Sequence, residues 1–146
     1  MSHIRQRHPD LAIGVAGFPE AHAEARSFAD DLAVMQRKVA CGADFVITQL
    51  YFDNRVYFDY VDRLRALGVT VPVVPGILPI RNLGSLRFVL EMCNARIPGR
   101  LINALMKAHD EGGAAAVGEI GIAYSREQVK GLLDGGAPGV HLYTLN

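Results

Sequence analysis

The sequence predicts an α/β fold of about four parallel strands with intervening helices, equivalent to half of an eight-stranded (β/α)8 barrel. Short apolar runs bounded by glycine, proline or polar residues indicate buried strands, and they alternate with segments whose apolar residues have helical spacing. Strands separated by helices pair in parallel through right-handed crossovers. The 146 residues, half of them hydrophobic, are enough for one domain with a substantial core. The predicted strands lie within Leu11–Phe18, Asp44–Phe52, Val69–Leu78 and Val140–Leu145.

Composition argues against several classes of partner. Acidic and basic residues balance at 15 each, so bulk electrostatics do not favour nucleic acid. Cys41 and Cys93 have no metal-type spacing, which indicates reduced thiols. No apolar run approaches the roughly 20 residues of a membrane span, and the N-terminus lacks the apolar segment of a signal peptide. We therefore expect a soluble cytoplasmic protein that binds neither metal, nucleic acid nor membrane.

The first predicted unit contains the junction at which a ligand is most expected. Residues 1–10 are polar and indicate the end of a helix and a loop. The strand within Leu11–Phe18 opens into the polar turn Pro19–His22, and a helix is predicted directly after it, over Ala23–Cys41. Gly42 ends that helix as a C-cap. Ligands gather where strands of such sheets end, because helix N-termini and loop side chains meet there.

The second and third units follow the same pattern. Asp44–Phe52 is too apolar for an exposed edge strand, and Asp53 or Asn54 is predicted to cap the next helix, which ends at Gly68. Two prolines interrupt the third apolar run, so its strand should be short and lie near Val71–Val74. The stripe of the helix is Val56, Tyr57, Tyr60, Val61, Leu64 and Leu67.

Three helical segments are predicted before the last strand. Asn82–Cys93 forms one helix, and Pro98 occupies the first turn of the next, which runs to Ala108. Two glycines at 112 and 113 break the pattern before a helix over Ala114–Leu133. Ser125 and Gln128 also match a capping box that opens a new helix, but the apolar spacing favours one continuous helix. The residues predicted to point inward from the first segment are Leu83, Leu86, Val89, Leu90 and Cys93.

Four segments in order resemble a known family. GVAGFPEAHAEA, DDLAVMQRKVACGADFVITQLYFD, VPVVPGILPI and HLYTLN are similar to the second half of the methylenetetrahydrofolate reductase barrel. The resemblance covers the chain from about Leu11 to Asn146, with matching separations. It implies barrel units five to eight, without the last helix, of a (β/α)8 TIM-barrel flavoprotein.

The resemblance also implies a reaction and a division of labour. The family binds FAD and uses NADH or NADPH to convert 5,10-methylenetetrahydrofolate into 5-methyltetrahydrofolate, in one-carbon and methionine metabolism. The glutamate that acts as general acid belongs to the first half of the barrel. No catalytic residue is therefore expected in this chain, and we expect the chain alone to be inactive.

Six residues match family positions that contact FAD. An imidazole and free helix amides suit the polar and phosphate groups of a nucleotide, cations suit a diphosphate, and an acid suits a ribose or an amine. An ordinary helix start and a charged, solvated helix face explain the same residues without a ligand. Phe18 stands where a tyrosine is common and lacks its hydroxyl. The matching residues are Phe18, His22, Ala25, Asp31, Arg37 and Lys38.

Two residues match family positions that contact substrate. Gln49 is an amide in an apolar strand, where it must be hydrogen-bonded, either by a ligand or by neighbouring backbone. Tyr143 matches a tyrosine of the last strand. Phe88 lies where a ring can stack on the pterin or nicotinamide, although core packing explains it equally well. Ser85 stands where some relatives have a substrate-contacting glutamine, so that role is not carried over.

Two alternatives remain open at this point. The chain can be a non-catalytic half-barrel that forms a homo-oligomer or binds a partner chain through its open sheet edges. It can also be a free-standing flavin- or nucleotide-binding fragment. The sequence shows no nucleophile–base pair, carboxylate pair or glycine-rich phosphate motif, so any hydride chemistry depends on the cofactor.

Overall fold

The structure, a computed structural model, describes residues 2–93 and 95–144, except the side chains of residues 88, 91 and 92. The predicted stacking role of Phe88 and the terminal residue Asn146 therefore lie outside the described part. Within the described residues, none of the helices combines the length and apolar character needed to cross a membrane.

Within the described residues, five short strands form the sheet elements, and all their pairings are parallel. They are β1 (Gly14–Gly17), β2 (Phe45–Thr48), β3 (Val73–Val74), β4 (Gly76–Ile77) and β5 (His141–Leu142). The pairing order is β1–β2–β3 in one sheet and β4–β5 in the other. The third predicted strand is thus short, as expected, and Pro75 divides it into β3 and β4 because proline has no amide to donate.

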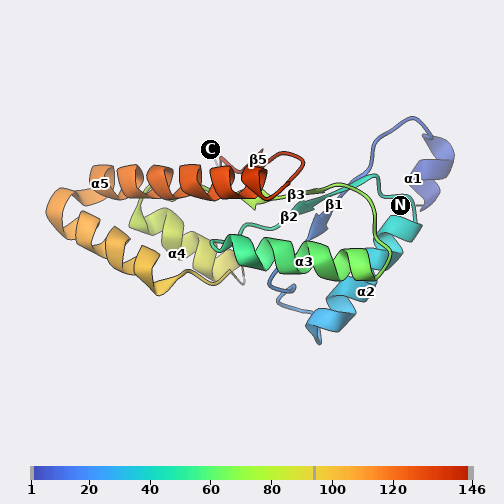
Figure 1. Cartoon of the computed structure of the whole chain (residues 1–146), viewed down its shortest axis with the longest axis horizontal. Coiled ribbons are helices and arrows are strands. Elements are labelled where there is room, and N and C mark those ends of the chain that lie inside the picture. Colours follow the sequence, from blue (N-terminus) through green and yellow to red (C-terminus); the bar gives the residue numbers. More distant parts are fainter. Residues whose placement is uncertain (1, 94, 145–146) are drawn as a thin grey trace.

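In the part of the chain that the structure describes, five helices connect and flank these strands (Figure 1). They are α1 (Ser2–Arg7), α2 (Phe28–Ala40), α3 (Asn54–Ala66), α4 (Leu83–Met92) and α5 (Gly99–Asp134). Figure 1 shows α5, coloured orange to red, folding back on itself. The bend is at Gly113, whose φ of 65° and ψ of −151° are not helical, so the predicted glycine break is confirmed. The helix then passes through Ser125 without interruption, as the apolar spacing favoured.

Side-chain caps define where three helices begin. Asp53 caps α3, as predicted, and Asn82 forms a reciprocal capping box with Ser85 at the start of α4. Helix α2 begins later than predicted, because Ser27 caps it by accepting a hydrogen bond from the Asp30 backbone N–H at 3.1 Å. The prediction that a helix follows the Pro19–His22 turn directly was therefore wrong, and an irregular loop separates them.

The core consists of two clusters of buried side chains. The first packs α2, α3 and the end of α5 against β1–β4, and the second packs α4 and α5 against the segments that follow β2 and β4. Leu90 was predicted to point inward but is 49% exposed, and Leu67 is 39% exposed. Both lie near the C-terminal ends of their helices, where the apolar stripe of the helix continues beyond the core that the helix packs against. The largest fully buried side chains include Tyr51, Tyr60, Leu64, Ile77, Leu105 and Leu132.

One face of the sheet is more open than the other. In β2, Val46 and Thr48 are fully buried toward the helices, whereas Phe45 and Ile47 on the opposite face are only half-buried. Leu142 of β5 is 54% exposed. In the described part of the chain β1 pairs only with β2, and β5 only with β4. The predicted association through these edges stays a prediction.

An ion pair at the amino ends of the strands gives a pH-dependent contribution to stability. The Asp44 carboxylate accepts hydrogen bonds from the Ile13 backbone N–H at 2.7 Å and from the Arg5 guanidinium. These two donors, the backbone N–H first, hold the pKa of Asp44 below its usual range. A carboxyl with a lowered pKa adds stability that is present above its ordinary pKa, about 4, and is lost as the pH falls through the lower folded value.

We therefore expect Asp44→Asn to lower the urea midpoint at pH 7 and to have a smaller effect at pH 3. Asp62→Asn, at an exposed position of α3, serves as the matched control with little effect at either pH. Chemical denaturation at both pH values measures the difference. Equal losses for Asp44→Asn at pH 7 and pH 3 would contradict the assignment of this stability to the ionised carboxyl.

Candidate functional site

Three of the predicted site residues each follow the end of a parallel strand. Phe18 is the first residue after β1, Gln49 the first after β2, and Tyr143 the first after β5. The carboxyl ends of parallel strands share one edge of a sheet, where α/β proteins bind ligands. The structure thus places Phe18 and Gln49 at one edge of the β1–β2–β3 sheet, whereas Tyr143 follows a strand of the other sheet.

The loop that follows β1 is built from two tight turns. The Ala21 backbone N–H donates to the Phe18 carbonyl at 3.0 Å, and the Ala25 N–H donates to the His22 carbonyl at 2.9 Å. Between them Ala21 has a φ of 67°, in the left-handed region that residues with a Cβ rarely adopt. Such strain persists only where surrounding contacts hold it, and it is most common at functional sites.

The His22 ring is held in one orientation. Its Nδ1 accepts a hydrogen bond from the Glu24 backbone N–H at 3.2 Å, so the neutral ring carries its proton on Nε2. The ring meets Phe18 edge to face, with the ring centroids 4.6 Å apart. The backbone N–H of His22 in turn donates to the Asp31 carboxylate at 3.3 Å. The loop therefore presents one aromatic ring and one N–H donor as a unit tied to α2.

Beside this unit lies the β1–α2 hollow, an open cavity of about 440 Å³ between β1 and α2. Lys38 reaches back over the strand, with its Nζ 3.0 Å from the Ala16 carbonyl and 5.9 Å from the centroid of the Phe18 ring. A lysine that covers the edge of a strand also protects that edge from pairing. The hollow is lined by Ala16, Phe18, His22, Glu24, Ala25, Asp30, Asp31, Val34 and Lys38.

The β1–α2 hollow collects five of the six residues predicted to contact FAD. Asp31 and Lys38 share one face of α2, as their spacing indicated. Val34, on the same face, lines the hollow without offering a polar group. Arg37 is exposed and does not line the hollow, since its position in the helix turns it away from β1.

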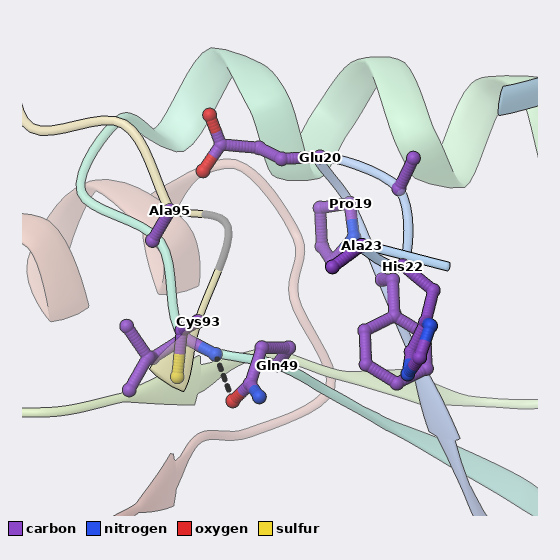
Figure 2. A pocket seen from close by; sticks show the side chains of 10 residues that line it. Pro19, Glu20, His22, Ala23, Gln49, Cys93 and Ala95 are labelled. Atoms are coloured by element: carbon purple, nitrogen blue, oxygen red, sulfur yellow. Dashed lines mark hydrogen bonds between the residues drawn. The ribbon is translucent and has the colours of Figure 1, made fainter. Parts of the chain in front are cut away.

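A second, smaller cavity lies on the other side of the Phe18–His22 pair. This inner hollow, of about 80 Å³, is shown in Figure 2. Figure 2 places Gln49 between His22 on one side and Cys93 on the other. The lining residues are Phe18, Pro19, Glu20, Ala21, His22, Ala23, Gln49, Leu50, Cys93 and Ala95. Phe18 and His22 therefore form a wall shared by the two hollows.

Gln49 has one end of its amide fixed and one end available. Its Oε1 accepts a hydrogen bond from the Leu50 backbone N–H at 3.0 Å. The sequence had predicted a partner for this amide, either a ligand or neighbouring backbone, and the oxygen has a backbone partner. Its Nε2 donates to none of the described residues, and the side chain is only half-buried. The fixed oxygen orients the amide, so the nitrogen is presented to the inner hollow as a donor.

Tyr143 reaches across the sheet instead of into the inner hollow. Its hydroxyl donates to the Thr48 carbonyl at 3.0 Å. The ring passes over Gly76, where an added Cβ would lie 2.6 Å from the ring and 2.2 Å from the Thr48 oxygen. The Gly76 N–H itself donates to the Thr48 hydroxyl at 2.9 Å. Tyr143 thus joins the carboxyl ends of β2 and β5, and its predicted contact with substrate stays a prediction.

Glu20 and Cys93, the two acidic side chains of the inner hollow, were not predicted as site residues. The Glu20 carboxylate accepts a hydrogen bond from the Arg96 backbone N–H at 3.0 Å, and burial raises the pKa of Glu20 in spite of that bond. Burial likewise raises the pKa of the Cys93 thiol. The sequence carried no signal for the role of Glu20, because its contact joins residues 76 positions apart. The described residues contain no group of three or more His, Cys, Asp or Glu side chains that could hold a metal ion.

Comparisons with known proteins agree on one family. A family model described as "Methylenetetrahydrofolate reductase" matches residues 1–146. "Methylenetetrahydrofolate reductase (NADH) 1" of Zea mays is 37% identical over 156 residues, which covers 100% of this chain and 26% of the maize protein. The "5,10-methylenetetrahydrofolate reductase" of Escherichia coli (strain K12) is 36% identical over 137 residues, or 94% of this chain and 46% of that protein. The chain thus spans between about a quarter and about half of these relatives.

A solved structure shows the same fold. A Clostridium thermocellum protein, described as uncharacterized and as binding two copies of 5-methyl-5,6,7,8-tetrahydrofolic acid, aligns with a TM-score of 0.64 at 21% identity. The alignment covers 99% of this chain and 52% of that one. With its parallel strands and flanking helices, the fold is consistent with part of an α/β barrel.

Proposed function

Because this chain belongs to the methylenetetrahydrofolate reductase family, we propose that it forms units five to eight of a flavin-dependent reductase barrel. The proposed reaction is the reduction of 5,10-methylenetetrahydrofolate to 5-methyltetrahydrofolate, with FAD as cofactor and NADH or NADPH as reductant. The names of relatives include both reductants, NADH in maize and NADPH in Caenorhabditis elegans. The folate-binding Clostridium protein supports the same class of substrate.

The observation that carries this proposal is the composition of the β1–α2 hollow. Five residues from a strand end, a loop and a helix converge on one open cavity, and together they offer an ammonium, a carboxylate, an N–H donor and an aromatic ring. A dinucleotide needs those groups for its phosphates, hydroxyls and rings. The residues present therefore fit FAD. What FAD supplies when bound is the hydride chemistry that the side chains lack.

Each side chain has a definite task in this proposal. Lys38 neutralises phosphate charge at the edge of β1, and Asp31 accepts from a hydroxyl or an amine while it also accepts from the backbone N–H of His22. The Nε2–H of His22 donates a hydrogen bond, and Phe18 gives an apolar surface without the hydroxyl of a tyrosine. Arg37, which precedes Lys38 in α2 and is exposed, is proposed as an outer contact to the diphosphate.

On the other side of the Phe18–His22 wall, the inner hollow is proposed as the substrate end of the site. Gln49 presents its Nε2 there, where a folate or nicotinamide carbonyl can accept. The hollow is also lined by Cys93 and Ala95, from the segment that follows α4. Only the Phe18 and His22 rings, which line both cavities, thus lie between the β1–α2 hollow proposed for the cofactor and the inner hollow proposed for the substrate.

Titration of free FAD with the protein tests this function. We expect quenching of flavin fluorescence, and we expect Lys38→Met to weaken the apparent affinity about tenfold, as for the loss of one charge-assisted contact. Arg37→Met should cost less, because Arg37 does not line the hollow. Lys107→Met, at an exposed position of α5, is the matched control and should bind as the unmodified protein does. Equal affinity for Lys38→Met and the Lys107→Met control would contradict the site.

A further inference from the structure

Among the described residues, the loop between β1 and α2 has one side chain that forms a hydrogen bond with a distant segment of the chain. This contact, the anchor, is not itself part of either hollow's proposed ligand contacts. Residues 19–26 lie between the end of β1 and the Ser27 cap of α2, and Ala21 holds a left-handed φ within them. Turn hydrogen bonds alone fix only neighbouring residues. The Glu20 carboxylate, in contrast, accepts from the Arg96 backbone N–H at 3.0 Å and so joins the loop to the segment between α4 and α5.

The Glu20 and His22 side chains leave the loop on opposite sides. Glu20 and His22 flank the left-handed Ala21, and Figure 2 shows the Glu20 side chain extending toward Ala95 while His22 lies on the other side of the loop, by Gln49. Ala95, the residue before Arg96, is 9% exposed and belongs to the second core cluster, so the residue next to the anchor point is held by packing. A shift of the anchor would therefore move the His22 ring relative to Gln49.

The anchor also has an energetic signature. Glu20 is half-buried, and burial raises its pKa more than the hydrogen bond from Arg96 and the Arg96 charge lower it, with Asp53 adding repulsion. A carboxylate held partly out of water without a full ion pair costs free energy. A fully exposed glutamate would not have its pKa raised by burial, so the raised pKa of Glu20 agrees with a side chain held against the segment between α4 and α5.

From this geometry we propose that Glu20 is a positioning residue: its bond to the Arg96 amide fixes the place of the His22 ring, which lines both the inner hollow and the β1–α2 hollow where FAD is proposed to bind. The inference rests on the proposed function for its consequence, FAD affinity, but the anchor itself is independent of that function. The role needs a hydrogen-bond acceptor at this position and not a charge, so glutamine can replace glutamate.

The test compares Glu20→Ala, Glu20→Gln and the unmodified chain. Hydrogen exchange resolved at the Arg96 amide and across residues 21–25 reports the anchor, and flavin titration reports the site. We expect Glu20→Ala to speed exchange of the Arg96 amide about tenfold and to weaken FAD binding by about five- to tenfold. Glu20→Gln should restore both quantities to near the unmodified values. Glu111→Ala, which removes an exposed glutamate of α5, is the matched control.

The outcomes separate the two claims. Unchanged exchange at Arg96 in Glu20→Ala overturns the anchor, and so does a Glu20→Gln variant that behaves like Glu20→Ala. Faster exchange in Glu20→Ala with undiminished FAD binding overturns the positioning role. If the unmodified chain does not bind FAD, the proposed function fails as assigned to this chain, and with it the effect of Glu20 on the cofactor, while the exchange data still decide whether the anchor exists. A thermal melt confirms that each variant is folded.

Discussion

Replacement of Gly121 by alanine is expected to destabilise the protein by about 3 kcal/mol, because the new methyl group has no space. An ideal Cβ at Gly121 would lie 1.9 Å from the Ile80 carbonyl oxygen and 2.8 Å from its carbon. Both are backbone atoms of the segment that follows β4, so no side-chain rotation relieves the clash. Helix α5 must move away from that segment, and the second core cluster, which contains Ile80 and Val117, loses its packing.

Urea denaturation of Gly121→Ala and Gly99→Ala measures this effect against a matched control. Gly99 is the first residue of the same helix, and an added Cβ there meets nothing within 4 Å. Gly99→Ala should therefore be neutral or stabilise by up to about 1 kcal/mol, because alanine restricts the unfolded chain. Similar losses for both variants would show that helix α5 does not lie against the Ile80 backbone as described.

In the proposed reductase, replacement of Gln49 by alanine is expected to lower kcat/KM for methylenetetrahydrofolate reduction by between about 10- and 100-fold. The amide is oriented by the bond from the Leu50 N–H to Oε1, which leaves Nε2 directed to the inner hollow. Loss of one preoriented hydrogen bond to a bound substrate costs about 1.5–3 kcal/mol in the transition state, which corresponds to that range.

Steady-state kinetics with Gln36→Ala as control isolates the role of Gln49. Gln36 is a glutamine of α2 whose Nε2 donates to the Leu67 carbonyl at 2.9 Å on the outer surface, away from both hollows. Its replacement should leave kcat/KM unchanged. If Gln49→Ala is as active as Gln36→Ala, the inner hollow is not the substrate end of the site. FAD affinity should be unaffected by Gln49→Ala, since Gln49 does not line the β1–α2 hollow.

Local sequence patterns determined much of the fold. Asp53 was recognised as a cap because its short carboxylate can accept from the backbone of the next turn, and Gly113 was recognised as a break because few other residues adopt its conformation. The same reasoning placed Gln49 at a strand end and Asp31 and Lys38 on one helix face. These features depend on neighbouring residues alone, so periodicity and residue type were sufficient.

Longer-range features were decided by tertiary structure. The start of α2 at Ser27 depends on how the loop after β1 folds, and that loop is held by the contact from Glu20 to Arg96. The exposure of Arg37 depends on which side of α2 faces β1, and both of two adjacent basic residues looked equally suited from the sequence. Sequence by itself thus determined the strand–helix order and the family, whereas the predicted strand Asp44–Phe52 continues past the actual end of β2 at Thr48. Only the packed chain decided which side chains share a cavity, because desolvation and contacts between distant segments arise only when the elements pack together.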